Sequence, residues 1–326
     1  MNTILITGGT GFIGANLAAR LAARGFNVRI LRRENSDLRA INGIDVEHRI
    51  GDLRDQESVM AAMKECDIVL HTAAMIHSPR SKVHDQHDVN VLGTRTVVEA
   101  CIASGIERLV FTSSVAALGY AGDGLRTTEE TTFNPHTASA YGLSKHLAEK
   151  EVLAGVKRGL HAVIVNPSVV VGERDIHAHG GELVLSSKRG WIPFYISGGM
   201  NVVYVGDVVA GHIAAAERGR SGERYILSGE NLTHKEIFER AARLLGVRPP
   251  LGRLPIPLFK AGVATLGAVA TLLGKEPWIS SGLARWAGRN NWYSCEKAQR
   301  ELGYSMTPFE RAIVACYEWY RENGFV

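Results

Sequence analysis

Cysteine is scarce in this sequence of 326 residues: there are four, Cys66, Cys101, Cys295 and Cys316, and they lie far apart. No CxxC pair occurs, and no Cys/His group has the spacing of metal ligands, so we expect neither a metal site nor a disulfide framework. Reduced, mostly structural thiols are typical of a cytoplasmic protein. The N-terminus also lacks a basic segment followed by an apolar run and a cleavage site, so we expect no signal peptide.

An excess of charge of one sign is absent as well. Lys and Arg number 37 and Asp and Glu 33, which gives a formal net charge of +4. No basic run of the kind that binds nucleic acid occurs, so we expect no nucleic-acid partner. Apolar residues make up 45% of the chain, as in ordinary globular proteins, and its length suffices for two domains or for one domain with an added lobe.

Long hydrophobic runs are few. One apolar stretch, residues 258–274, contains Lys260 and is shorter than the roughly 20 residues that a membrane-spanning helix needs. We therefore expect no integral membrane segment. The stretch is interpreted as a packing helix, a lid over an apolar substrate or a surface that touches a membrane.

Apolar, β-branched runs alternate with segments of helical periodicity through the first half of the chain. Strands are expected at Ile4–Thr7, Asn27–Leu31, Val46–Ile50, Ile68–Thr72, Leu109–Thr112 and Ala162–Val165, and helices at Ala15–Arg24, Gln56–Lys64, Val89–Ser104 and Tyr141–Gly155. Nearly continuous apolar strands separated by helices predict an α/β fold whose doubly wound parallel sheet is covered on both faces. Such sheets bind ligands at the carboxyl ends of their strands.

The alternation loosens after Pro167, where glycine and proline become frequent. Short strands are still expected at Val202–Val205 and Tyr225–Leu227. We therefore predict a cofactor-binding domain made of residues 1–166 and about 201–227. A smaller, interleaved α+β substrate lobe is expected from about 167–200 and 228–326.

A glycine-spaced turn follows the first expected strand. Gly8, Gly11 and Gly14 are three residues apart, and helical periodicity begins directly after them. The first glycine permits the tight turn, the second lets the backbone approach a pyrophosphate, and the third lets the helix pack on the strand. Free N–H groups at the start of the helix then bind phosphate, so we predict a Rossmann-type dinucleotide site. The other contacts expected in this turn are Thr10, Phe12 and Ile13.

The end of the second expected strand indicates which dinucleotide binds. An acidic residue there would bind the ribose 2′-hydroxyl of NAD(H), but Arg32 and Arg33 stand there instead. Arginine suits a 2′-phosphate through its charge and its paired hydrogen bonds. We therefore expect NADP(H) as the preferred cofactor. NAD(H) is the alternative, because a shift of one or two residues would bring in Glu34.

Further cofactor contacts are expected after the third and fourth strands. The Asp52 carboxylate can accept a hydrogen bond from an adenine amino group, and Leu53 follows it; the nearby Asp55 is as well explained as a helix N-cap. Small residues after the fourth strand would let the backbone lie against the cofactor. They are Thr72, Ala73 and Ala74.

Tyr141 and Lys145 are four residues apart on an expected helix and so share a face. A free tyrosine has a pKa of about 10, and a nearby lysine ammonium is expected to lower that pKa. The phenol could then exchange a proton with a carbonyl or alcohol oxygen while hydride moves at a nicotinamide. Ser114, at the end of the fifth strand, can bind the same oxygen. Cofactor contacts are also expected here from Thr112, Ser113, Tyr141 and Lys145.

With these motifs together, the chain resembles the extended short-chain dehydrogenases/reductases of the NAD(P)-dependent epimerase/dehydratase superfamily. The resemblance spans nearly the whole chain and rests on TGGTGFIG (7–14), GDL (51–53), HTAA (71–74), DVNVLGT (88–94), FTSS (111–114), YGLSK (141–145), NPSVVVG (166–172) and EKAQRELGY (296–304). It implies catalytic roles for Ser114, Tyr141, Lys145 and Asn90 and a homodimer formed through a helix bundle. Within NPSVVVG, cofactor contacts are expected from Pro167 and Val169.

Several residues discriminate between branches of that family. Val115 and Ala116 replace the Asp-Glu pair of sugar-nucleotide dehydratases, which disfavours dehydration. Leu118 and Met200 stand where sugar-nucleotide epimerases usually carry Tyr and Arg, and a thioether offers nothing to a diphosphate. The segment after Ser114 is more similar to dihydroflavonol reductases and 3β-hydroxysteroid dehydrogenases, and the second half to hopanoid-associated epimerase-like proteins.

We therefore expect a cytoplasmic NADPH-dependent reductase or dehydrogenase. It would interconvert a carbonyl and a secondary alcohol on a hydrophobic small molecule. The alternative enzyme is a nucleotide-sugar epimerase with a tightly bound cofactor. A redox-sensing regulator is disfavoured, since a sensor need not retain Ser114, Tyr141 and Lys145 together.

Overall fold

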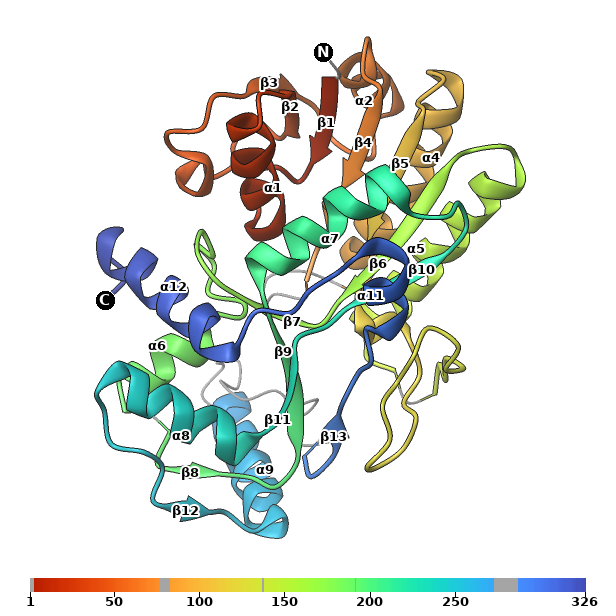
Figure 1. The fold of residues 1–326 in the computed structure, drawn as a ribbon. Helices are drawn as coiled ribbons and strands as arrows, with labels where there is room; N and C mark the ends of the chain where they lie inside the picture. The colour runs from red at the N-terminus through yellow and green to blue at the C-terminus, as the bar shows by residue number, and fades with distance from the viewer. Residues whose placement is uncertain (1–2, 77–82, 137, 191, 273–286) are drawn as a thin grey trace.

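The computed structural model describes residues 3–76, 83–136, 138–190, 192–272 and 287–326 (Figure 1). Its main sheet has seven parallel strands in the order β10-β6-β5-β4-β1-β2-β3. The strands are β1 (Thr3–Thr7), β2 (Asn27–Arg32), β3 (Glu47–Ile50), β4 (Ile68–His71), β5 (Arg108–Thr112), β6 (Ala162–Pro167) and β10 (Arg224–Leu227). Their arrangement confirms the expected doubly wound α/β fold.

Helices cover both faces of this sheet. One face packs against α1 (Phe12–Ala23), α7 (Val205–Arg218) and α11 (Glu296–Leu302), and the other against α2 (Gln56–Met63), α4 (Gly93–Ala103) and α5 (Ala140–Lys157). Side chains alternate between the faces along each strand: Ile4 and Ile6 belong to the first core and Leu5 to the second. This two-sided burial explains the nearly continuous apolar strands of the sequence.

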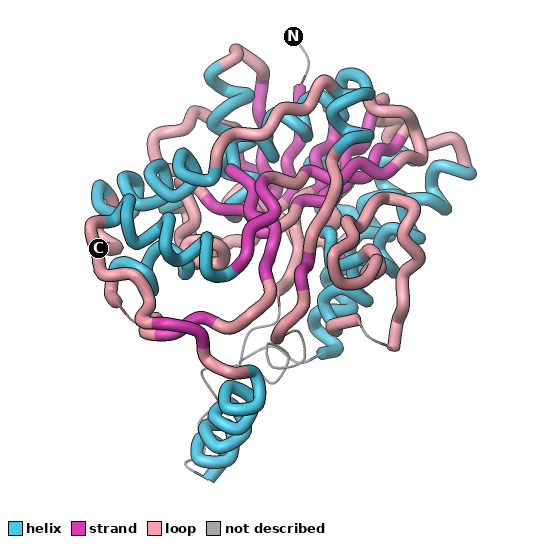
Figure 2. Tube along the Cα trace, turned by 60° about the horizontal axis from the view of Figure 1, so that its bottom comes forward, coloured by secondary structure: helices cyan, strands magenta, loops and turns pink. Residues whose placement is uncertain are grey.

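A second, smaller unit surrounds the strand β9 (Gly199–Tyr204). This strand pairs with β7 (Val169–Val171), β11 (Glu230–Thr233) and β13 (Asn290–Asn291), and a separate two-stranded ribbon joins β8 (Phe194–Tyr195) to β12 (Gly252–Arg253). The helices of this region are α6 (Glu182–Lys188), α8 (His234–Leu245), α9 (Ile256–Leu272) and α12 (Phe309–Glu322). Figure 2 shows α9 projecting from the ribbon, away from the two larger sheets. Among the described residues, no helix is long and apolar enough to cross a bilayer.

Most expected elements lie within a few residues of their observed positions, and two differ in an informative way. The strand expected at Val202–Val205 ends at Tyr204, and Val205 begins α7, whose first turn contains the acidic Asp207. A carboxylate in the first turn favours a helix start through the helix dipole. The lobe boundaries drawn from the sequence remain a prediction.

The helix expected at Val89–Ser104 opens with a π-helical turn, η2 (Asp88–Leu92), which follows α3 (Val83–His87) and precedes α4. In the turn, the Asn90 carbonyl accepts a hydrogen bond from the Thr94 hydroxyl at 2.7 Å. Short 3₁₀ segments also occur at η1 (Arg39–Ile41) and η3 (Val115–Ala117). π-Turns are rare and often lie at functional sites.

Two fully buried histidines connect the sheet to its helices. His71 contacts the Thr7 hydroxyl at 2.6 Å and the Thr94 hydroxyl at 3.0 Å. His212 donates from Nδ1 to the Val208 carbonyl, so that Nε2 accepts from the Thr112 hydroxyl at 2.8 Å. Burial lowers the pKa of His71 to about 3, with a smaller contribution from the Lys145 charge, and burial lowers the pKa of His212 to about 4.

The folded protein should lose stability as the pH falls from 6.5 towards 5. The unfolded chain protonates both histidines near their ordinary pKa of about 6.5, whereas the folded chain holds them neutral, so acid favours unfolding. Each histidine should contribute a slope of about 1.4 kcal/mol per pH unit. In urea unfolding at several pH values, His212→Gln should reduce the slope by that amount. His161→Gln, at an exposed position, is the control and should leave the slope unchanged. Equal slopes in wild type and His212→Gln would contradict this account.

Candidate active site

The glycine turn between β1 and α1 leaves no room for side chains. Gly8 has φ +70°, and a Cβ there would lie 2.6 Å from Ala73 Cα, while a Cβ on Gly14 would lie 2.2 Å from the Gly8 carbonyl oxygen. Gly11 is the N-cap of α1, and within the described residues no side chain caps that helix. The first-turn N–H groups beside the half-buried Thr10, Phe12 and Ile13 are therefore suited to bind an anionic group. This cradle fits the pyrophosphate of a dinucleotide.

The end of β4 forms a wall of this cradle. The Thr72 hydroxyl donates to the Thr7 carbonyl at 2.8 Å, and Ala73 lies against Gly8. Ala74, the next residue, is exposed. The small residues expected after the fourth strand thus lie beside the glycine turn, where backbone can approach a ligand.

The ends of β2 and β3 bring cationic groups together. Arg32 ends β2 and donates from Nε to His48 Nδ1 at 2.9 Å, and Arg33 follows it at an exposed position. Asp52 is paired with Arg54 at 2.7 Å. Hydrogen bonds from Arg54, with a smaller contribution from the Arg33 charge, lower the pKa of Asp52 to about 2. Leu53 is buried and packs beneath Gly93.

Arg54 was not among the expected cofactor residues. Its signal in the sequence was the short Asp52-x-Arg54 spacing, which lets the guanidinium reach back to the carboxylate. The cluster at this edge therefore has three arginines and one carboxylate already engaged by one of them. Glu34, the residue that would favour NAD(H), is exposed.

Helix α5 carries the expected acid/base pair. It begins at Ser139, whose hydroxyl accepts from the Gly142 N–H at 3.0 Å. A Cβ on Gly142 would lie 2.4 Å from the Ala116 carbonyl oxygen, so the first turn packs closely on η3. This contact brings Tyr141 beside Ser114, and the two side chains are hydrogen bonded.

Lys145 is buried one turn further along α5, with 1% of its surface exposed. Its ammonium donates to the Thr112 carbonyl at 2.6 Å and lies 4.3 Å from the centre of the Phe111 ring. Burial lowers the pKa of Lys145 to about 7, and the charge of Glu149 acts in the opposite direction. Strand β5 thus fixes the ammonium beside the first turn of α5.

The pKa of Tyr141 differs from the expectation that Lys145 lowers it. Burial raises this pKa to about 12, and only the hydrogen bond with Ser114 acts in the lowering direction. The expected lowering was therefore wrong for this structure, because the Lys145 ammonium is directed at the Thr112 carbonyl. At neutral pH the phenol is protonated, which is the form that donates a proton.

Thr112 and Ser113 turn their side chains into the interior. The Thr112 hydroxyl donates to His212, and the Ser113 hydroxyl donates to Glu149 Oε1 at 2.6 Å. Glu149 was missed in the sequence, although it follows Lys145 by four residues on the same helix face as Tyr141. Asn166 and Arg224 also donate to its carboxylate, at 2.7 and 2.8 Å.

Asn90 lies in the π-turn and is buried. Its Oδ1 accepts from the Met75 N–H at 2.7 Å, and its Nδ2 donates to the Met75 carbonyl and the Ser144 hydroxyl, both at 3.0 Å. These contacts join the segment after β4 to α5 at the residue next to Lys145. Asn90 is therefore part of the framework beneath the acid/base pair.

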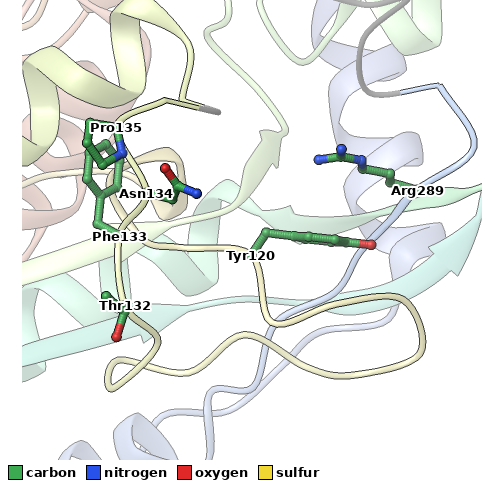
Figure 3. A pocket seen from close by; sticks show the side chains of 6 residues that line it. All are labelled: Tyr120, Thr132, Phe133, Asn134, Pro135 and Arg289. Carbon is green, nitrogen blue, oxygen red and sulfur yellow. The ribbon is translucent and has the colours of Figure 1, made fainter.

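A cavity of about 290 Å³ is lined by Val115 and Ala116, which follow Ser114 in the chain, and by Ser139, two residues before Tyr141. It is mostly apolar, and Val169, at the start of β7 two residues after Pro167, contributes to its wall. The other lining residues are Leu118, Gly119, Tyr120, Phe133, Asn134, Ala138, Met200, Asn201, Asn291 and Tyr293. A second, more open hollow of about 500 Å³ shares Tyr120, Phe133 and Asn134 with it. Figure 3 shows Arg289 of this hollow across Tyr120 from the 132–135 segment.

Residues 4–228 match the model of the NAD dependent epimerase/dehydratase family. The chain belongs to this family. It is 34% identical over 98% of its length to the putative dihydroflavonol 4-reductase of Synechocystis sp., of which the match covers 95%. It is 33% identical over 99% of its length to the whole of sterol demethylase protein B of Methylococcus capsulatus. The crystal structure of gox2253 superposes with a TM-score of 0.88 at 35% identity, covering 99% of each chain.

These likenesses confirm the resemblance and the fold class inferred from the sequence. Family members with reductase and dehydrogenase names make the chain an NAD(P)-dependent oxidoreductase of the extended short-chain dehydrogenase/reductase type. The tight glycine cradle and the uncapped start of α1 fit the dinucleotide that such an enzyme uses.

Replacing Gly14 with alanine should weaken dinucleotide binding by at least about tenfold, because the new Cβ meets the Gly8 carbonyl oxygen and distorts the phosphate cradle. Titration of cofactor fluorescence would measure the dissociation constant. Gly262→Ala is a matched control, since Gly262 is also helical but a Cβ there meets no atom within 4 Å. Wild-type affinity in Gly14→Ala would show that the turn does not hold the cofactor.

Proposed function

We propose that this enzyme is an NADP(H)-dependent reductase/dehydrogenase that interconverts a carbonyl and a secondary alcohol on a hydrophobic small molecule. The observation that carries the proposal is the Ser114–Tyr141 contact together with an apolar cavity lined by residues that neighbour both in the chain, Val115 and Ser139. Val115, Leu118, Val169 and Met200 line that cavity, and none of them can bind the charge of a sugar diphosphate. The reductase and sterol names of similar proteins support a polycyclic or comparably apolar substrate.

The proposed proton transfer runs through Tyr141. A nicotinamide cofactor held at the glycine cradle supplies the hydride. Tyr141 donates its phenolic proton to the substrate oxygen, and the Ser114 hydroxyl orients that oxygen. In this structure the Thr112 carbonyl holds the Lys145 ammonium, and the role proposed for Lys145 is to bind the nicotinamide ribose. The high pKa of Tyr141 keeps the phenol protonated at neutral pH, the form that donates a proton in the direction of reduction.

The preference for NADP(H) rests on the cationic edge at the end of β2. Arg32, Arg33 and Arg54 gather there, and Asp52 is engaged by Arg54. A 2′-phosphate would meet two exposed or half-exposed guanidinium groups that can form charge-assisted hydrogen bonds. A homodimer stays a prediction from the family resemblance, and a cytoplasmic location stays a prediction from the scarce, widely spaced cysteines.

Tyr141→Phe should lower kcat by about 10²–10⁴-fold, because it removes the only hydroxyl proposed to transfer the proton. Cofactor affinity should be retained. The assay follows NADPH oxidation with a panel of apolar ketones and identifies the alcohol formed. Tyr317→Phe, remote from the cavity, is the control and should keep the wild-type rate.

Two outcomes of that assay would overturn the proposed function. One is a wild-type rate in Tyr141→Phe. The other is interconversion of sugar-nucleotide epimers without net NADPH consumption, together with a cofactor retained through purification, which would establish the epimerase alternative.

Replacing both Arg32 and Arg33 with alanine should weaken NADPH binding by about 10- to 100-fold and leave NADH binding unchanged, because charge-assisted hydrogen bonds to the 2′-phosphate are lost. Dissociation constants for both cofactors test this. Arg39→Ala is the control, since Arg39 is also an exposed arginine but is paired with Asp37 at 2.7 Å. Tighter binding of NADH than of NADPH by the wild type would refute the preference.

A further inference from the structure

Helix α9 leaves an apolar face exposed. Leu258 and Leu266 are 62% and 56% exposed, and Gly262 lies between them at the same four-residue spacing, so the three share one face of the helix. Val263, on another face, is buried. Isolated exposed leucines are ordinary on protein surfaces, but a continuous apolar helix face is typical of a binding surface.

The adjoining β8/β12 ribbon extends this surface. Phe194 begins β8 and is 48% exposed, and Leu251 directly precedes β12 and is 83% exposed. Leu251 donates its N–H to the Pro193 carbonyl, so the two apolar side chains stand at the same end of the ribbon. We call Phe194, Leu251, Leu258 and Leu266 the apolar rim.

The charges in the sequence segment that carries three of the four rim residues all have one sign. From Leu244 to Gly274 the sequence contains no Asp or Glu, whereas it contains Arg248, Arg253 and Lys260. These three basic residues are exposed, and none of them pairs with a carboxylate in the described part of the chain. A protein surface of ordinary composition would not match the combination of exposed apolar side chains and positive charge. An anionic lipid surface matches both.

We propose that α9 and the β8/β12 ribbon dock on the surface of an anionic lipid bilayer. At about 1.5 Å per residue α9 is about 25 Å long, shorter than a hydrocarbon core of about 30 Å. The helix therefore lies in the plane of the interface, with Leu258 and Leu266 among the acyl chains. Arg253 and Lys260 meet the lipid phosphates.

The docking helix is joined to the wall of the apolar cavity. A Cβ on Gly288 would lie 2.5 Å from Ile256 Cδ1, so the first turn of α9 packs directly on that glycine. Gly288 precedes Arg289, which lines the open hollow, and β13, whose Asn291 lines the apolar cavity. Docking through α9 therefore brings the cavity near the lipid. The docking itself does not depend on the proposed reaction.

Vesicle flotation of the full chain tests the proposal. Wild type should float with vesicles of equal parts phosphatidylglycerol and phosphatidylcholine and much less with phosphatidylcholine alone. Leu258→Glu combined with Leu266→Glu should lower recovery at least about tenfold, because it places carboxylates on the docking face. Met60→Glu, at an exposed apolar residue of α2, is the matched control and should float as wild type.

A milder double variant keeps the test independent of folding defects. Arg253→Gln with Lys260→Gln retains every apolar contact and should lower partitioning onto the anionic vesicles about fivefold for each charge removed. Partitioning onto phosphatidylcholine alone should not change. Circular dichroism and thermal unfolding establish that each variant is folded.

Three results would overturn the proposal. The first is absence of wild-type flotation with anionic vesicles. The second is a wild-type oligomer that Leu258→Glu with Leu266→Glu dissociates in sedimentation, because a second copy would then cover the apolar rim. The third is unchanged flotation together with a raised KM for apolar ketones in that variant, which would make α9 a lid over its own cavity.

Discussion

The carboxylate of Glu149 is fully buried between α5 and three neighbouring strands. Ser113 after β5, Asn166 in β6 and Arg224 in β10 each donate a hydrogen bond to it. A buried carboxylate is tolerated only with such partners, since its desolvation costs several kcal/mol. Glu149 shares a helix face with Tyr141 and Lys145. These three bonds therefore fix the rotation of α5, and with it the position of the acid/base pair.

The same network sets the charge state of the site. Lys145 is buried, and its ammonium is supported by the Thr112 carbonyl, the Phe111 ring and the charge of Glu149. The Thr112 hydroxyl is itself held by His212 on α7, from the opposite face of the sheet. Helices on both faces thus hold the end of β5. The pKa values of Tyr141, about 12, and Lys145, about 7, follow from burial in this dry region.

Local patterns carried most of what the sequence predicted. Strand and helix positions follow from the hydrophobic periodicity of residues close together in the sequence, and the glycine turn follows from a fixed spacing. Both were therefore predicted from the sequence. What the sequence did not predict depends on partners far along the chain. Asn90 bonds to Ser144, 54 residues away, and Ser113 bonds to Glu149, 36 residues away. The direction of the Lys145 ammonium depends on a carbonyl 33 residues earlier, and the pKa of Tyr141 depends on its burial in the folded chain.

The substrate cavity differs in kind from the cofactor cradle. The glycine turn and the end of β4 form the cradle, whereas the cavity wall combines residues 115–116, 118–120, 133–134, 138–139, 169, 200–201, 291 and 293. Short segments from many parts of the chain can change separately, which explains how one catalytic framework serves many substrates. An apolar substrate is itself more concentrated in lipid than in water. Under the two proposals, the segment that leads into β13 connects the two sites: Asn291 of β13 lines the cavity, and Gly288, two residues before β13, packs against the first turn of α9. A bilayer-docked helix and an apolar cavity then share one wall, so the substrate need not cross bulk water to reach Tyr141.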